Sequence, residues 1–138
     1  MKRKHVIVSL FVVAVMVFLT ACSFSVTTAK LKNVVLAKDK DGNTPTSVFG
    51  QSDTFYCVGD LVNAPDDTKL TAKWYAVKVV GIKVEPNHLI GERSLTSGSS
   101  HFYFSLTHKP GSIWPKGQYK VELYIDDKPV QTLKFEVK

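Results

Sequence analysis

Several signals of enzymes and helical proteins are missing from this chain. There is no Gly-x-Ser-x-Gly motif and no glycine-rich phosphate loop, so the usual signatures of serine hydrolases and nucleotide-binding proteins are absent. No window has the 3.6-residue apolar periodicity of an amphipathic helix. We therefore expect a protein that is not an enzyme and uses no cofactor, unless the fold assembles a catalytic group that the linear sequence hides.

Metal-binding patterns are missing as well. The segment 39–43 contains two aspartates, but its glycine, Gly42, stands fourth and the twelfth position is Gly50. An EF-hand loop requires glycine at position six and glutamate at position twelve, so we expect a plain hairpin turn. No cysteine pair accompanies the histidines beyond the N-terminal segment, and their spacing is not that of metal ligands. We expect no metal site and surface positions for His88, His101 and His108.

The N-terminal segment has the pattern of an export signal. Three basic residues at positions 2–4 precede an apolar run from Val6 to Leu19 that only Ser9 interrupts. A positive start, a short apolar stretch and small residues before a cleavage point are typical of a secretory signal. The run is shorter than the roughly 20 apolar residues that a membrane-spanning helix needs.

The end of this segment is more specific. Leu19-Thr20-Ala21-Cys22 resembles the lipobox of bacterial lipoproteins. The resemblance implies that residues 1–21 are removed and that Cys22 becomes a diacylated N-terminus, followed by a tether over 22–30. It also implies that a lipid on Cys22 anchors the protein in the cell membrane or outer membrane, facing the periplasm or exterior. The alternative is a plain signal peptide, or a signal anchor, with a chance cysteine.

The charge of the chain gives no indication of a nucleic-acid partner. The net charge of +6 falls to +3 when the three basic residues at positions 2–4, which no acidic residue of the signal offsets, are set aside. The remaining lysines are scattered, whereas nucleic-acid binding needs a clustered basic patch. We therefore expect no nucleic-acid binding.

Residues 31–138 are enough for one domain, and their apolar residues alternate with a period of two. The run Tyr119–Ile125 places an apolar residue at every second position, and 70–76, 102–106 and 131–137 repeat the pattern. Such alternation indicates half-buried strands. Turn residues separate the runs, and we predict about seven strands, with 95–100 as a loop. The expected strands lie near 31–38, 53–62, 69–79, 80–84 continued by 88–93, 101–107, 118–126 and 130–137.

The positions of three residues suggest the kind of β-sandwich. Cys57 falls on the second strand, Trp74 on the third, and Tyr119 begins the sixth. This pattern resembles immunoglobulin-like and fibronectin-type-III-like domains, in which a core tryptophan packs beside a disulfide. Val121 occupies the position of the second cysteine, so Cys57 is expected to be an unpaired, buried thiol. The fold class we predict is all-β, an immunoglobulin-like antiparallel β-sandwich over residues 31–138.

The same alternation points to a candidate binding face. If Trp74 and Leu123 point inward, their neighbours Tyr75 and Tyr124 point outward, and the third and sixth strands are neighbours in this fold. The two tyrosines are then close together, flanked by Lys73, Lys120 and Glu122. Tyrosine is enriched at interfaces. The alternative is that the two tyrosines only brace the sheet.

Trp114 is the other aromatic candidate, since it lies in a loop between Pro110-Gly111 and Pro115. It is expected either to contact a carbohydrate or protein, or to act as a lid that closes one end of the sandwich over Tyr119 and Phe104. The sequence thus predicts a membrane-anchored, non-catalytic binding module that contacts an envelope protein or polymer. The alternative is a structural envelope component, and an enzyme is a distant third.

Overall fold

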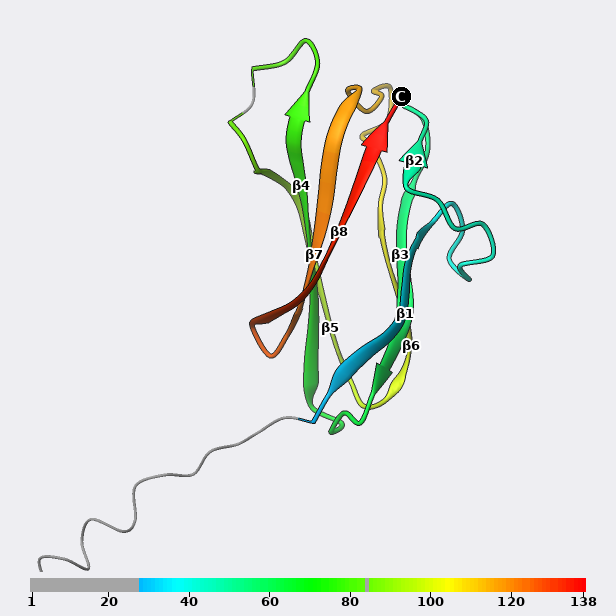
Figure 1. Cartoon of the computed structure of the whole chain (residues 1–138), viewed down its shortest axis with the longest axis vertical. Helices are drawn as coiled ribbons and strands as arrows, with labels where there is room; N and C mark the ends of the chain where they lie inside the picture. The colour runs from blue at the N-terminus through cyan, green and yellow to red at the C-terminus, as the bar shows by residue number, and fades with distance from the viewer. Residues whose placement is uncertain (1–27, 84) are drawn as a thin grey trace, which may run out of the picture.

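Two β-sheets, facing each other, are formed by the residues that the computed structural model describes, 28–83 and 85–138 (Figure 1). One sheet has three strands in the order β1-β3-β6, and the other has five in the order β2-β8-β7-β4-β5. The strands are β1 (Lys30–Ala37), β2 (Val48–Phe49), β3 (Phe55–Val62), β4 (Thr68–Val79), β5 (His88–Ser97), β6 (Ser100–Leu106), β7 (Gly117–Ile125) and β8 (Lys128–Val137). The all-β sandwich expected from the sequence is confirmed. The expected signal peptide and Cys22 lie outside the described residues.

Most neighbouring strands in both sheets are antiparallel, and the exception is β2, which pairs in parallel with the end of β8. The prediction that the third and sixth strands are neighbours is confirmed, because β4 and β7 pair along most of their length. The strand β5 pairs with β4 and not with β6. The five-stranded sheet therefore has β4 and β7 near its centre, covered on both sides by neighbours.

Two predicted boundaries differ from the structure. The residues 80–84 were expected to begin a strand, but the described part of this segment is a turn, and β5 begins at His88. Val80 and Ile82 have the alternation of a half-buried strand, but both side chains are exposed. The alternation in this segment therefore does not mark a strand. The expected loop at 95–100 is shorter, because Leu95 lies within β5 and the turn is confined to residues 98–99.

The core lies between the sheets and follows the predicted alternation. In β7, the residues Tyr119, Val121, Leu123 and Ile125 are all buried, and fully burying such side chains contributes about 1.5–3 kcal/mol each. The side chain of Trp74 is fully buried. The predicted inward positions of these residues are confirmed.

The sandwich has two distinct ends, which Figure 1 shows as opposite poles of the long axis. Lys30 pairs with Val62 at the end where the described chain begins, and we call this the Lys30 end. The opposite end, which we call the Trp114 end, carries the loop after β4 and the loop that leads into β7. The β2–β3 segment also lies at the Trp114 end, because the backbone N–H of Trp114 donates to the carbonyl oxygen of Gln51 at 2.8 Å.

Gly117 allows the two strands at the Trp114 end to approach closely. Its φ angle is +149°, and a Cβ atom built at this position would lie 2.2 Å from the carbonyl oxygen of Lys78. Only glycine adopts such a backbone without strain. Gly117 therefore brings the start of β7 against the last residues of β4.

The turn at 39–43 is held by its first aspartate. The Asp39 carboxylate accepts backbone N–H groups from Asp41, Asn43 and Thr44, at 2.7–3.2 Å. The hydrogen bond from Asn43 is the largest of the effects that lower the pKa of Asp39. A carboxylate that accepts three backbone donors behaves as in a polar turn, as the sequence predicted.

Candidate binding surfaces

The solvent side of the five-stranded sheet carries the predicted aromatic face at its centre. In the pairing of β4 with β7, Lys73 stands opposite Glu122, and Tyr75 stands opposite Lys120. Tyr124 pairs with Thr71 on β4, so the Lys73–Glu122 pair lies between it and the pair that contains Tyr75. We call the five residues Lys73, Tyr75, Lys120, Glu122 and Tyr124 the outer-face cluster.

Direct contacts link the members of the outer-face cluster. The Lys120 ammonium lies 2.8 Å from a Glu122 carboxylate oxygen and 5.0 Å from the centre of the Tyr75 ring. The Lys73 ammonium lies 4.7 Å from the centre of the Tyr124 ring. The Tyr124 hydroxyl donates to the other Glu122 oxygen at 2.7 Å. Each tyrosine ring is therefore paired with a lysine ammonium group. The Glu122 carboxylate links the two pairs, because it contacts Lys120 of one and Tyr124 of the other.

The electrostatics follow from these contacts. Hydrogen bonds from Lys120 and then from Tyr124 hold the pKa of Glu122 below its usual value. The same carboxylate raises the pKa of Tyr124, because an ionised phenol would lose its hydrogen bond and face a negative charge. The cluster thus combines one carboxylate with two lysine and two tyrosine side chains. Its net charge is positive, and its aromatic rings are held in fixed orientations.

The structure brings together the residues that the sequence suggested for this face, with one change of emphasis. The sequence placed Glu122 beside the tyrosines as a flanking residue, whereas its carboxylate contacts both Lys120 and Tyr124. The side chains of Lys120 and Glu122 are only 20% and 18% exposed. The outer-face cluster is therefore a half-buried group and not a set of free side chains.

Trp114 lies apart from the outer-face cluster, at the Trp114 end of the sandwich. Its indole ring stacks on Phe55 with centroids 4.7 Å apart, and it makes a T-shaped contact with Tyr119 with centroids 6.5 Å apart. The indole N–H donates to the carbonyl oxygen of Asp53 at 2.8 Å. The ring therefore packs over the core as a partly buried lid, with Phe55 and Tyr119 beneath it. The sequence suggested a lid over Tyr119 and Phe104, and the ring that stacks on the indole is Phe55.

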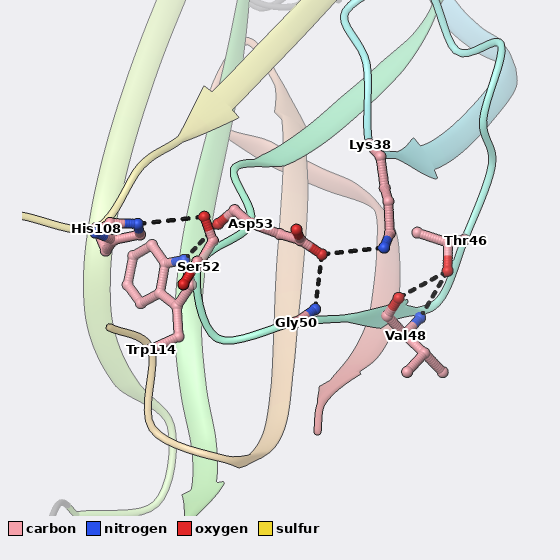
Figure 2. A network of polar contacts seen from close by, with 8 residues as sticks. All are labelled: Lys38, Thr46, Val48, Gly50, Ser52, Asp53, His108 and Trp114. Carbon is pink, nitrogen blue, oxygen red and sulfur yellow. Dashed lines mark hydrogen bonds and ion pairs between the residues drawn. The ribbon is translucent and has the colours of Figure 1, made fainter. Parts of the chain in front are cut away.

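A polar network around Trp114 fixes the β2–β3 segment (Figure 2). The Asp53 carboxylate accepts the Gly50 backbone N–H at 2.7 Å and lies 3.2 Å from the Lys38 ammonium. His108 lies at the edge of the Trp114 ring, and its Nε2 is 3.3 Å from the carbonyl oxygen of Ser52. This network holds the lid in place.

Cys57 lies in the core, as predicted. Its side chain is fully buried, and burial raises the pKa of its thiol to about 12. A thiol in such surroundings is poorly ionised and chemically inert. Among the described residues it is the free cysteine.

The histidines lie apart from one another. His88 is in β5, His101 in β6 and His108 in the loop that follows β6. His101 pairs with Asp60 at 2.9 Å. In the described part of the chain, no group of three or more histidine, cysteine, aspartate or glutamate residues is arranged to hold a metal ion. The same residues contain no helix long and apolar enough to cross a membrane.

Comparison with known proteins finds similarity in structure but none in sequence. No protein-family model matches the sequence, and no curated protein matches it. An immunoglobulin-like protein from Pseudomonas aeruginosa superposes with a TM-score of 0.57 at 11% identity, over 83% of this chain and 100% of that one. The fold is an immunoglobulin-like β-sandwich.

Two other structural matches are to larger enzymes. An alkylpurine DNA glycosylase from Pseudomonas fluorescens gives a TM-score of 0.52 at 14% identity, over 80% of this chain and 30% of the glycosylase. A β-glucosidase from Listeria innocua gives 0.51 at 12% identity, over 83% of this chain and 17% of the glucosidase. This chain thus spans under a third of each enzyme, and at these identities the likeness concerns the fold alone.

Proposed function

We propose that this chain is a lipid-anchored, extracytoplasmic binding module without catalytic activity, which contacts an envelope protein or polymer through the outer-face cluster. The single observation that supports the contact surface is the linked arrangement of Lys73, Tyr75, Lys120, Glu122 and Tyr124 on the solvent side of the sheet. The anchor is supported by the lipobox that ends at Cys22.

The outer-face cluster suits binding because its rings are already oriented. Binding costs about 0.5–1.5 kcal/mol for each flexible side chain that must be ordered. The rings of Tyr75 and Tyr124 each lie beneath an ammonium group, so less of this cost remains. Rigid aromatic side chains provide contact area at low entropic cost. A partner with acidic or hydroxyl groups would complement the two lysines.

The position in the fold supports the same proposal. β4 and β7 are central strands of their sheet, so the cluster lies on a rigid surface. The described chain enters at the Lys30 end, where the Thr28 hydroxyl donates to the carbonyl oxygen of Asn63. A lipid on Cys22 would therefore tether the domain by one pole and leave the side of the five-stranded sheet accessible.

The contact surface is tested by capturing partners from envelope extracts with residues 23–138. We expect the double variant Tyr75→Ala, Tyr124→Ala to abolish capture, because aromatic hot spots contribute about 2 kcal/mol or more each, which is roughly thirtyfold in affinity for each residue. The matched control is Tyr56→Ala with Tyr103→Ala, a tyrosine pair on the other sheet whose rings are 6.4 Å apart. Melting curves of all variants separate loss of contact from loss of folding.

Two outcomes would contradict this part of the proposal. One is full capture by the well-folded Tyr75 and Tyr124 double variant. The other is an equal loss of capture in the control pair on β3 and β6. If the double variant loses folding in place of binding, the tyrosines brace the sheet, which is the alternative that the sequence left open.

The anchor is tested in the full chain. We expect Cys22→Ala to abolish incorporation of a labelled fatty acid and to release the protein from the membrane fraction or leave an unprocessed precursor. Ser23→Ala is the control, since it keeps the lipobox cysteine. Unchanged labelling of the Cys22 variant would refute lipidation at this residue.

A further inference from the structure

The Trp114 end carries an apolar patch that the proposed contact face does not use. The three most exposed large hydrophobic residues of the described chain are Val80 at 73%, Ile113 at 57% and Ile82 at 52%. Single exposed apolar residues are ordinary on protein surfaces. Here, however, all three line one hollow of about 340 Å³ beside Trp114 and Lys116. We call Val80, Ile82 and Ile113 the apolar tip.

Two loops far apart in sequence build the apolar tip. Val80 and Ile82 follow β4, and Ile113 lies in the loop before β7. The loops are joined by a hydrogen bond of 2.8 Å from the Val80 backbone N–H to the carbonyl oxygen of Lys116. In Figure 1 the loop after β4 projects beyond the body of the sandwich. The tip is thus a projecting feature whose aliphatic side chains are not covered by the described chain.

Basic residues surround the apolar tip. Lys116 lines both the hollow at the tip and a neighbouring one of about 580 Å³, which also includes Val80, Lys78 and Lys138. The same two loops add two further exposed lysines, at 83 and 109. The adjoining hollow also includes Glu136, whose carboxylate lies 4.0 Å from the Lys138 ammonium, and the loop after β4 contains Glu85. The two loops and the hollow thus contain five lysines and two glutamates.

This combination identifies the chemistry of the occupant. Aliphatic side chains on a projecting loop can enter the acyl boundary of a bilayer, while lysines beside them meet lipid phosphates. We propose that the apolar tip and its lysines bind the surface of an anionic lipid bilayer. A second copy of the chain is disfavoured, because packing two such tips together would bring like charges together. The proposed site lies at the Trp114 end, and the proposal depends neither on the outer-face cluster nor on lipidation of Cys22.

The test uses residues 23–138, which contain every buried core residue of the described structure. The protein is sedimented with vesicles of phosphatidylcholine alone and with vesicles that contain phosphatidylglycerol as well. We expect binding to the anionic vesicles to be at least roughly tenfold tighter and to weaken as salt is raised, since each lysine near the surface adds to the attraction. Absence of binding to anionic vesicles, or equal binding to both kinds, would overturn the proposal.

Matched variants localise the interaction. Val80→Ser, Ile82→Ser and Ile113→Ser together, and separately Lys78→Gln, Lys83→Gln and Lys116→Gln together, are each expected to weaken vesicle binding roughly tenfold. The first control replaces Tyr103 and Val130, which are exposed away from the Trp114 end, by serine. The second replaces the exposed lysines at positions 32, 40 and 128 by glutamine and removes the same charge.

The controls decide whether the Trp114 end is the binding site. If both control variants bind as the unchanged protein does and both tip variants bind weakly, the site is confirmed. If the lysine control loses as much affinity as the tip lysine variant, the attraction comes from net charge and the proposed site is wrong. Retained binding by either well-folded tip variant also contradicts the proposal, and melting curves verify that each variant is folded.

Discussion

The Tyr119 hydroxyl donates to the carbonyl oxygen of Pro115, four residues upstream, at 2.5 Å. Tyrosines at the start of the corresponding strand make the same kind of backbone hydrogen bond in immunoglobulin domains. Here this bond fixes the loop that carries Trp114 to the start of β7. Burial raises the pKa of the Tyr119 phenol to about 12, so the hydroxyl remains a donor at neutral pH.

We predict that Tyr119→Phe lowers the free energy of unfolding by about 1–3 kcal/mol, because the variant leaves a partly buried carbonyl oxygen without its donor. Urea titration followed by tryptophan fluorescence measures the change. Tyr103→Phe is the control, since Tyr103 is 51% exposed and its replacement is expected to change stability by about 0.5 kcal/mol or less. Equal stability of the two variants would show that the hydrogen bond contributes little.

Cys57 gives a second prediction, which tests the register of β3. The thiol is fully buried and its pKa is raised to about 12. In residues 23–138, where Cys57 is the only cysteine, we expect a thiol reagent to react slowly with native protein at pH 8 and rapidly after unfolding by guanidinium. Rapid reaction of the native protein would mean that this side of β3 is accessible to solvent.

The inner and outer faces of the central strands could be predicted from the sequence, because strict alternation leaves one consistent arrangement. Trp74 and Val121 are buried while Tyr75 is only partly covered, as the period of two requires. The exact register could not be predicted. Irregularities between Ala76 and Lys78, and between Leu123 and Tyr124, shift the pairing of β7 with its neighbours, and such bulges have no strong signal in one sequence.

Other features depend on contacts between distant segments. The two-residue strand β2 was missed because Val48 and Phe49 are too few for a periodic pattern, and their parallel pairing with β8 arises from the completed sandwich. The apolar tip was missed for a related reason. Val80 and Ile82 have the alternation of a strand, and only the structure shows that they lie near Ile113 in an exposed loop.

Trp74 provides a third prediction. Its ring lies within the core and contacts Phe55 and Phe135, but its indole N–H is buried without a hydrogen-bond partner. A buried unpaired donor costs about 1–3 kcal/mol, and replacing the whole ring by alanine typically costs about 3–5 kcal/mol. We therefore expect Trp74→Phe to be clearly less destabilising than Trp74→Ala, because both variants remove the unpaired donor but only phenylalanine keeps ring contacts with Phe55 and Phe135. Guanidinium titrations of both variants measure the difference, and equal losses would mean that phenylalanine keeps none of the stabilising ring contacts at this position.

Glu122 connects the outer-face cluster to the pH dependence of stability. Hydrogen bonds from Lys120 and Tyr124 lower its pKa in the folded protein below the usual 4.5. A group whose pKa is lower in the folded state contributes stability above its unfolded pKa and loses it as pH falls through the folded value. We predict that Glu122→Gln melts at a lower temperature than the unchanged protein at pH 7, and that the difference shrinks as the pH is lowered through the range below 4.5. Glu85→Gln in the loop after β4 is the control, since Glu85 is exposed and lies outside the outer-face cluster, and the same replacement there is expected to change the melting temperature little. A melting difference for Glu122→Gln that is independent of pH would mean that the side chain contributes by packing and not through its charge.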